Sequence, residues 1–117
     1  MSASVPASMT AEAFAPIFNA HLRKVEAALA GIFAEAARDT PGRSAEEKEA
    51  YMQYLVARPD NAEAMQRAAS EGLGVSQELF QACLMKFGGR KQIVVAMEES
   101  HKRQEALHAR FLNDVSG

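Results

Sequence analysis

The sequence predicts an all-α fold, a single-domain bundle of about five helices with long first and last helices. Two observations support this class. Apolar residues recur every three or four positions over two long segments, whereas no alternating apolar and polar run reaches four residues. Capping residues, prolines and glycines divide the chain between these segments into short pieces of helical length. We expect residues 1–9 to form a flexible N-terminal tail and residues 10–115 to form a single helical domain.

Length and composition narrow the class of protein further. A chain of 117 residues suffices for one domain, and 48% hydrophobic with 24% charged residues is typical of globular proteins. The net charge of −2 argues against nucleic acid as a partner. The one cysteine excludes an intramolecular disulfide and fits a reducing compartment. Residues 1–9 lack the basic start and apolar run of a secretory signal, and no apolar run is long enough to span a bilayer. We therefore expect a cytoplasmic protein without membrane insertion.

The first helix is predicted to begin after the capping residue Thr10 and to end before the break at Thr40–Arg43. Pro16 removes one backbone hydrogen bond, so we expect a kink or a fresh helix start near residues 14–16. The apolar seam of this helix follows a helical spacing through Phe18, Leu22, Val25, Leu29, Ile32 and Ala36. A face this wide must be covered by several other helices.

Two short helices are predicted next. Ser44 and Glu47 form a capping box that starts the second helix. Arg58–Pro59 ends it, because the residue before a proline avoids the helical conformation. Asp60 with Glu63 repeats the capping pattern and is predicted to start the third helix.

The last two helices have equally clear boundaries. Ser76 is predicted to cap the fourth helix, and Gly88–Gly89 to end it. The fifth helix is then predicted from about Arg90 to the neighbourhood of Asn113.

Polar residues interrupt the apolar face of this last helix and form the first candidate site, a partner or ligand surface made of Ser100, His101, Gln104 and His108. Residues 98–105 contain no apolar side chain, which leaves two interpretations. They are a solvated length of helix, or a surface that meets an unidentified protein partner or a second copy of the chain. If the histidines lie in an interface, protonation near pH 6 adds charge there and weakens association.

Metal or small-ligand binding is the alternative for the same helix. Glu98 precedes His101 by three residues, and Glu105 precedes His108 by three, so each pair shares a helical face. The two histidines stand roughly 10.5 Å apart along the axis, too far for one ion. A di-metal bundle needs further inward carboxylates, and Glu26 lies near the edge of the first helix's apolar face. We therefore expect neither a metal nor a cofactor.

The second candidate site is an anion contact formed by Gly88, Gly89, Arg90 and Lys91, where free backbone N–H groups and two cations meet a helix start. The simpler interpretation is a helix end, a turn and a new helix start. No catalytic residues are predicted. Cys83 lies on an apolar stripe, His21 fits a core histidine satisfied by a backbone carbonyl, and no Gly-x-Ser-x-Gly elbow exists.

Two segments resemble parts of known helical families, and the first of these resemblances favours a binding module. Residues 14–29, FAPIFNAHLRKVEAAL, resemble one helix of the domain that binds Arf-like small GTPases, and residues 72–83, GLGVSQELFQAC, are similar to a later turn and helix of that superfamily. Residues 50–65, AYMQYLVARPDNAEAM, resemble the junction of two tetratricopeptide repeats, but no second copy follows about 34 residues away. We therefore expect a small cytosolic helical protein–protein interaction module without catalytic activity. The alternative is a metal- or small-ligand-binding protein.

Overall fold

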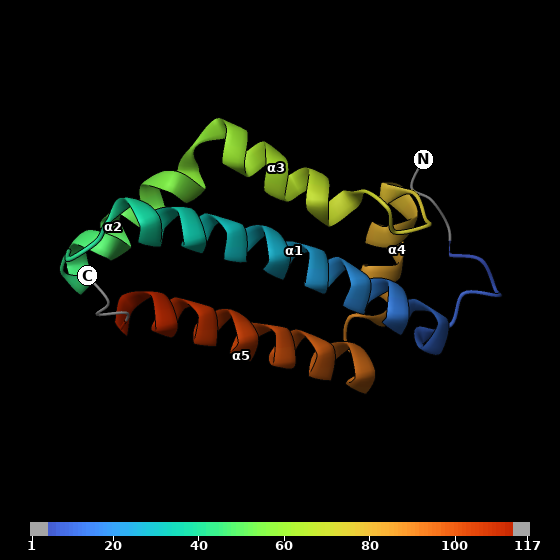
Figure 1. Cartoon of the computed structure of the whole chain (residues 1–117). Helices are drawn as coiled ribbons and strands as arrows, with labels where there is room; N and C mark the ends of the chain where they lie inside the picture. The colour runs from blue at the N-terminus through green and yellow to red at the C-terminus, as the bar shows by residue number, and fades with distance from the viewer. Residues whose placement is uncertain (1–4, 114–117) are drawn as a thin grey trace.

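A computed structural model describes residues 5–113 of the chain. Within this range the chain folds into five helices, which Figure 1 shows as one elongated bundle. The first and last helices have 29 and 23 residues, so the predicted all-α bundle with long outer helices is confirmed. The helices are α1 (Ala11–Asp39), α2 (Ala45–Ala57), α3 (Pro59–Ser70), α4 (Gln77–Phe87) and α5 (Lys91–Asn113). The predicted domain end at residue 115 lies outside the described residues.

Helix α1 is the central element of the bundle (Figure 1). α3 runs back along one side of α1, α4 crosses near the N-terminal end of α1, and α5 then runs parallel to α1 along its other side. α2 lies at the opposite end from α4. The molecule is therefore long and narrow, with extents of 54 × 28 × 18 Å. No helix among residues 5–113 is both long and apolar enough to cross a membrane.

Three helix starts follow the sequence prediction. The side chains of Thr10, Ser44 and Ser76 each accept a hydrogen bond from the backbone N–H three residues on, at 3.1, 3.2 and 3.1 Å. Each bond satisfies one of the amides that a helix start leaves without an internal partner.

Two sequence predictions differ from the structure. α1 continues through Pro16 as one helix from Ala11 to Asp39, so the fresh helix start near residues 14–16 is wrong, while a kink there stays a prediction. Phe14 and Phe18, on either side of Pro16, are both buried. α3 begins at Pro59 rather than after Asp60. Proline suits the first helical position, where its fixed φ is helical and its missing N–H is not needed. Arg58, with an extended ψ of 134°, therefore takes the capping position without a side-chain hydrogen bond.

Buried apolar residues form two cores, one at each end of the bundle. The α4-end core joins α1, α4 and α5 and consists of Ala11, Phe14, Phe18, Phe80, Cys83, Phe87, Ile93 and Ala96. The α2-end core joins α1, α2 and α5 and consists of Ile32, Phe33, Ala36, Met52, Leu55 and Phe111.

The segment before α1 is not helical in its described part. Val5 and Met9 are partly buried against the α4-end core, and the N–H of Met9 donates to the carbonyl of Pro6 at 3.0 Å. The flexibility expected for residues 1–9 stays a prediction.

Candidate functional site

A groove of about 440 Å³ lies between α2 and α5, with α1 beneath it. Its apolar floor is formed by Leu29, Phe33, Met52 and Val56, and its rim by Glu49, Gln53, Ala57, His101, Gln104, Glu105 and His108. We refer to these residues as the α2–α5 groove.

The floor of the groove is part of the α2-end core. Phe33 and Met52 belong to that core and are 8% and 4% exposed. Leu29 and Val56 pack against the core but are only half-buried. An object that enters the groove would therefore contact the hydrophobic interior directly, which is how ligand and peptide sites obtain most of their affinity.

The α5 wall of the groove carries three of the four residues predicted as a partner or ligand surface, namely His101, Gln104 and His108. Their spacing of three and four residues places them on one face of the helix. The side chain of His101 is 72% exposed, and its Nε2 pairs with Oε1 of Glu105 at 2.7 Å. This wall therefore offers both donors and acceptors to solvent.

His108 connects the two walls of the groove. Its Nε2 hydrogen-bonds Oε2 of Glu49 on α2, and its ring lies 5.7 Å from the ring of Phe33 in the floor. The hydrogen bond from His108 is the main reason why the pKa of the Glu49 carboxyl lies below its usual range, and a second bond from Gln53 adds to it. Glu49 was not among the predicted site residues, because it is 59 residues from His108 and only the fold brings the two together.

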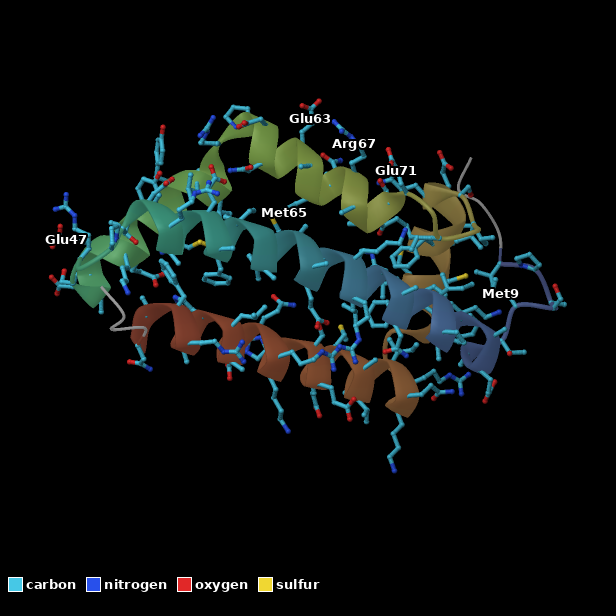
Figure 2. The ribbon with its side chains drawn as sticks, viewed as in Figure 1. Met9, Glu47, Glu63, Met65, Arg67 and Glu71 are labelled. Atoms are coloured by element: carbon cyan, nitrogen blue, oxygen red, sulfur yellow. The ribbon has the colours of Figure 1, made fainter. Side chains whose placement is uncertain are left out.

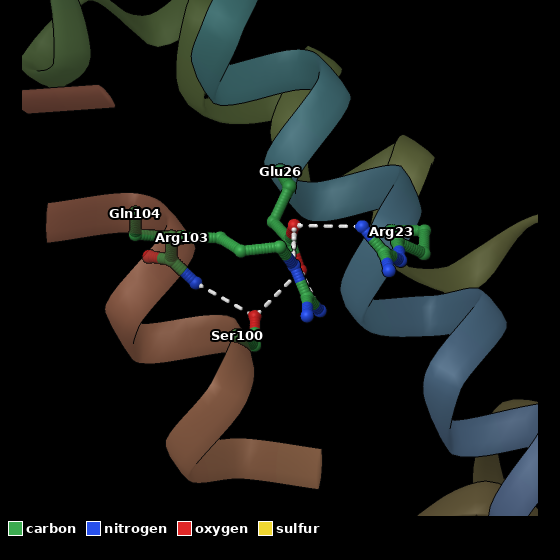
Figure 3. Close-up of polar contacts among 5 residues, drawn as sticks. All are labelled: Arg23, Glu26, Ser100, Arg103 and Gln104. Atoms are coloured by element: carbon green, nitrogen blue, oxygen red, sulfur yellow. Dashed lines mark hydrogen bonds and ion pairs between the residues drawn. The ribbon is translucent and has the colours of Figure 1, made fainter. Parts of the chain in front are cut away.

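Ser100, the fourth predicted residue, does not line the groove and is 1% exposed. Figure 3 shows its hydroxyl between Glu26 of α1 and Gln104 of α5. The hydroxyl donates to Oε2 of Glu26 at 2.7 Å and accepts from Nε2 of Gln104 at 3.2 Å. Ser100 therefore positions Gln104 and contributes no surface of its own.

Glu26 is the centre of a buried polar cluster between α1 and α5. It is 7% exposed, and Arg103 donates to its two oxygens from Nε at 2.6 Å and from Nη2 at 2.9 Å (Figure 3). These hydrogen bonds, with that from Ser100, lower the pKa of Glu26 although burial opposes the effect. Arg23 adds a longer ion pair at 3.7 Å. We call Glu26, Ser100 and Arg103 the seam cluster.

The seam cluster changes the interpretation of residues 98–105. The solvated interpretation holds for its exposed residues, which are Glu98, Glu99, His101, Lys102 and Glu105, whereas Ser100 is buried and Arg103 and Gln104 are half-buried. Glu26, expected near the edge of the apolar face, is buried because Arg103 and Ser100 satisfy its charge there. The polar stretch thus has an inner face that contacts α1 and an exposed face, part of which borders the groove.

The geometry does not bring together the residues of the metal alternative. His101 pairs with Glu105 and His108 with Glu49, whereas the prediction coupled His101 to Glu98 and His108 to Glu105. In the part of the chain that the structure describes, no group of three histidine, cysteine or carboxylate side chains could hold a metal ion.

The predicted anion contact forms the connection between α4 and α5. Gly88 comes directly after the last residue of α4. A larger residue would force the backbone to shift there, because a Cβ would lie 2.5 Å from the carbonyl oxygen of Leu84. The N–H of Arg90 donates to the carbonyl of Phe87 at 2.9 Å, and the carbonyl of Arg90 accepts from Ile93 and Val94. Gly88, Gly89, Arg90 and Lys91 therefore make a helix end, a turn and a helix start. An anion contact there stays a prediction.

Two other residues with possible chemical roles have structural partners. Nδ1 of His21 hydrogen-bonds the carbonyl of Ala69 at 2.7 Å, and its ring lies 4.7 Å from that of Phe80, so the expected backbone partner is confirmed. Cys83 is 1% exposed in the α4-end core, and burial raises the pKa of its thiol. A nucleophilic cysteine needs the opposite environment.

A second hollow lies on the outer face of α4 and has a volume of about 720 Å³. It is lined by Val5, Gln77, Glu78, Gln81, Ala82, Met85 and Lys86. Apart from Val5, these residues all come from one helix, and Met85 among them is 87% exposed. None of the described residues that line this hollow is buried, whereas Phe33 and Met52 are, so the α2–α5 groove is the stronger candidate.

Comparison with protein-family models, with curated proteins and with solved structures gives no match for this chain.

Proposed function

We propose that the protein is a helical protein–protein interaction module without catalytic activity, and that the α2–α5 groove is its binding surface. The observation that carries the proposal is a groove whose floor reaches the α2-end core while its rim stays exposed. Buried apolar anchors surrounded by a polar rim are the usual anatomy of a protein interface. Part of the rim, on α5, is the polar face that the sequence singles out.

The exposed rim favours a macromolecular partner over a small ligand. The groove volume of about 440 Å³ falls within the range of small-molecule sites, so such a ligand is the second candidate. Small-molecule sites, however, enclose most of the ligand surface. Here Gln53, His101 and Glu105 are all exposed, so the groove stays open to solvent along its length.

A cytoplasmic location belongs to the same proposal. Its support is the cysteine content: Cys83 is the one cysteine of the sequence and it is buried, and a low cysteine content fits a reducing compartment.

Site-specific photocrosslinking tests the proposal. A photoreactive phenylalanine analogue would replace Gln53 at the exposed edge of the groove and, in a matched control, Glu63 on the outer face of α3, whose side chain points away from the bundle (Figure 2). In extracts of the organism of origin we expect a discrete crosslinked product from position 53 and none from position 63. Equal products from both positions, or none from position 53, would contradict the proposed function.

A further inference from the structure

The charges of the α2–α5 groove select among protein partners. Among residues 5–113, four ionisable residues line it, Glu49, His101, Glu105 and His108, and no lysine or arginine does. Glu49 hydrogen-bonds His108 and Glu105 pairs with His101, and these two carboxylates are the acidic groups of the lining. Glu49 belongs to the α2 wall and Glu105 to the α5 wall, so a negative charge borders the apolar floor on each side.

The walls of the groove match a helix in length. The α5 wall from His101 to His108 spans roughly 10.5 Å, and the α2 wall from Glu49 to Ala57 roughly 12 Å, at the α-helical rise. Apolar side chains at positions i, i+4 and i+7 of a partner helix cover the same roughly 10.5 Å. A peptide that binds by adding a β-strand would need an unpaired strand edge, which two helical walls do not offer.

From the charge and the dimensions of the groove we infer that its occupant is an amphipathic helix of another protein, with lysine or arginine along both borders of its apolar stripe. This inference rests on the proposed function and specifies the partner. The apolar stripe would lie on Leu29, Phe33 and Val56, and the flanking cations would meet Glu49 on one side and Glu105 on the other.

A second copy of the chain fits this description poorly. The exposed large apolar side chains among residues 5–113 are Tyr54, Met85, Val95 and Met97. They belong to α2, α4 and α5, and no two of them lie three or four residues apart on one helix. No described helix of another copy therefore presents a stripe of fully exposed large apolar side chains at helical spacing.

Two synthetic peptides test the inference. Both are fluorescein-labelled helices with leucine at i, i+4 and i+7, and they differ only in lysine or glutamate along the two borders. Fluorescence anisotropy would measure their affinity for the full chain, for the double variant Glu49→Gln with Glu105→Gln, and for a control with Glu63→Gln and Glu71→Gln on the far side of the bundle. Glutamine keeps the size of each side chain but replaces the carboxylate charge and one of its two acceptor oxygens by an NH2 donor. Thermal unfolding would check that all three proteins are folded.

The wild-type chain and the control should bind the lysine peptide roughly tenfold more tightly than the glutamate peptide at low salt, and the double variant should lose this preference. Equal affinity for both peptides would overturn the inference but leave the groove as a helix-binding site, so the proposed function would stand. Binding of neither peptide would overturn the inference, and the crosslinking at position 53 would then decide the proposed function independently. If the molecular mass doubled as the protein concentration rose, and peptide binding was lost at the same time, a second copy would occupy the groove. That result would also overturn the inference.

Discussion

The α4-end core and the α2-end core share the two long helices but differ in how they are covered. At the α4 end, Phe14 and Ile93 are fully buried, and the ring of Phe14 lies 5.4–6.1 Å from those of Phe18, Phe80 and Phe87. At the α2 end, the core forms the floor of a groove whose rim is charged and exposed. Between the two ends lies the seam cluster around Glu26. The α4 end thus stabilises the bundle, while the α2 end leaves part of its core available for a partner.

The largest expected effect comes from the α4-end core. Phe14→Ala removes a ring with no exposed surface and leaves a cavity among three other rings, so it should lower the free energy of unfolding by about 3–5 kcal/mol. Urea denaturation followed by circular dichroism measures this change. A loss below about 1 kcal/mol would mean that the α4 end is not the main stabilising region.

The reaction rate of the Cys83 thiol measures how readily the α4-end core opens to solvent. Because Cys83 is buried and its thiol pKa is raised, it should react with a thiol reagent at least about a hundredfold more slowly in the native protein than in urea. Phe14→Ala should accelerate the reaction of the native protein. Fast labelling of the unmodified chain would show that this core opens readily and would remove the contrast between the two ends.

The seam cluster gives an intermediate effect that depends on pH. Arg103 and Ser100 lower the pKa of Glu26 in the folded state. The ionised carboxylate therefore stabilises the folded state fully when the pH is above the pKa that Glu26 has in the unfolded chain. This contribution should disappear as the pH falls through the lowered folded-state pKa. Glu26→Gln should cost roughly 1–3 kcal/mol at neutral pH and make the stability less sensitive to acid. Parallel acid dependences for the two proteins, measured by urea denaturation, would contradict this role.

The groove rim should have the smallest effect on stability. Glu49→Gln combined with Glu105→Gln removes two solvent-accessible charges and should change the free energy of unfolding by less than about 0.5 kcal/mol. The same pair of changes should abolish the preference for a basic helix. If thermal and urea denaturation instead revealed a loss above about 2 kcal/mol, the rim would be part of the folding core rather than a binding surface.

Local signals were sufficient for most of the fold. Thr10, Ser44 and Ser76 fix their own helix starts, because a cap depends on residues within one turn. The start of α3 was mispredicted because two local signals competed there: Pro59 supplies a fixed φ at the first helical position, which outweighs the capping pattern of Asp60 with Glu63.

The site could be predicted only in part. The spacing of His101, Gln104 and His108 places them on one face without any tertiary information. The other wall and the floor come from α1 and α2, so Glu49 and Phe33 have no local signal that connects them to α5. The burial of Ser100 also depends on a distant residue, since Glu26 lies 74 positions away in the sequence.

The most direct test of the α2–α5 groove as the binding surface is to follow the backbone amide chemical shifts of the isotope-labelled full chain while the lysine-bordered peptide is added. We expect the largest changes at Glu49–Ala57 of α2 and His101–His108 of α5, and small changes along α4. Changes centred on the outer face of α4, at Gln77–Lys86, would place binding at the second hollow. That result, or the absence of any localised change, would contradict the assignment of the α2–α5 groove as the binding surface.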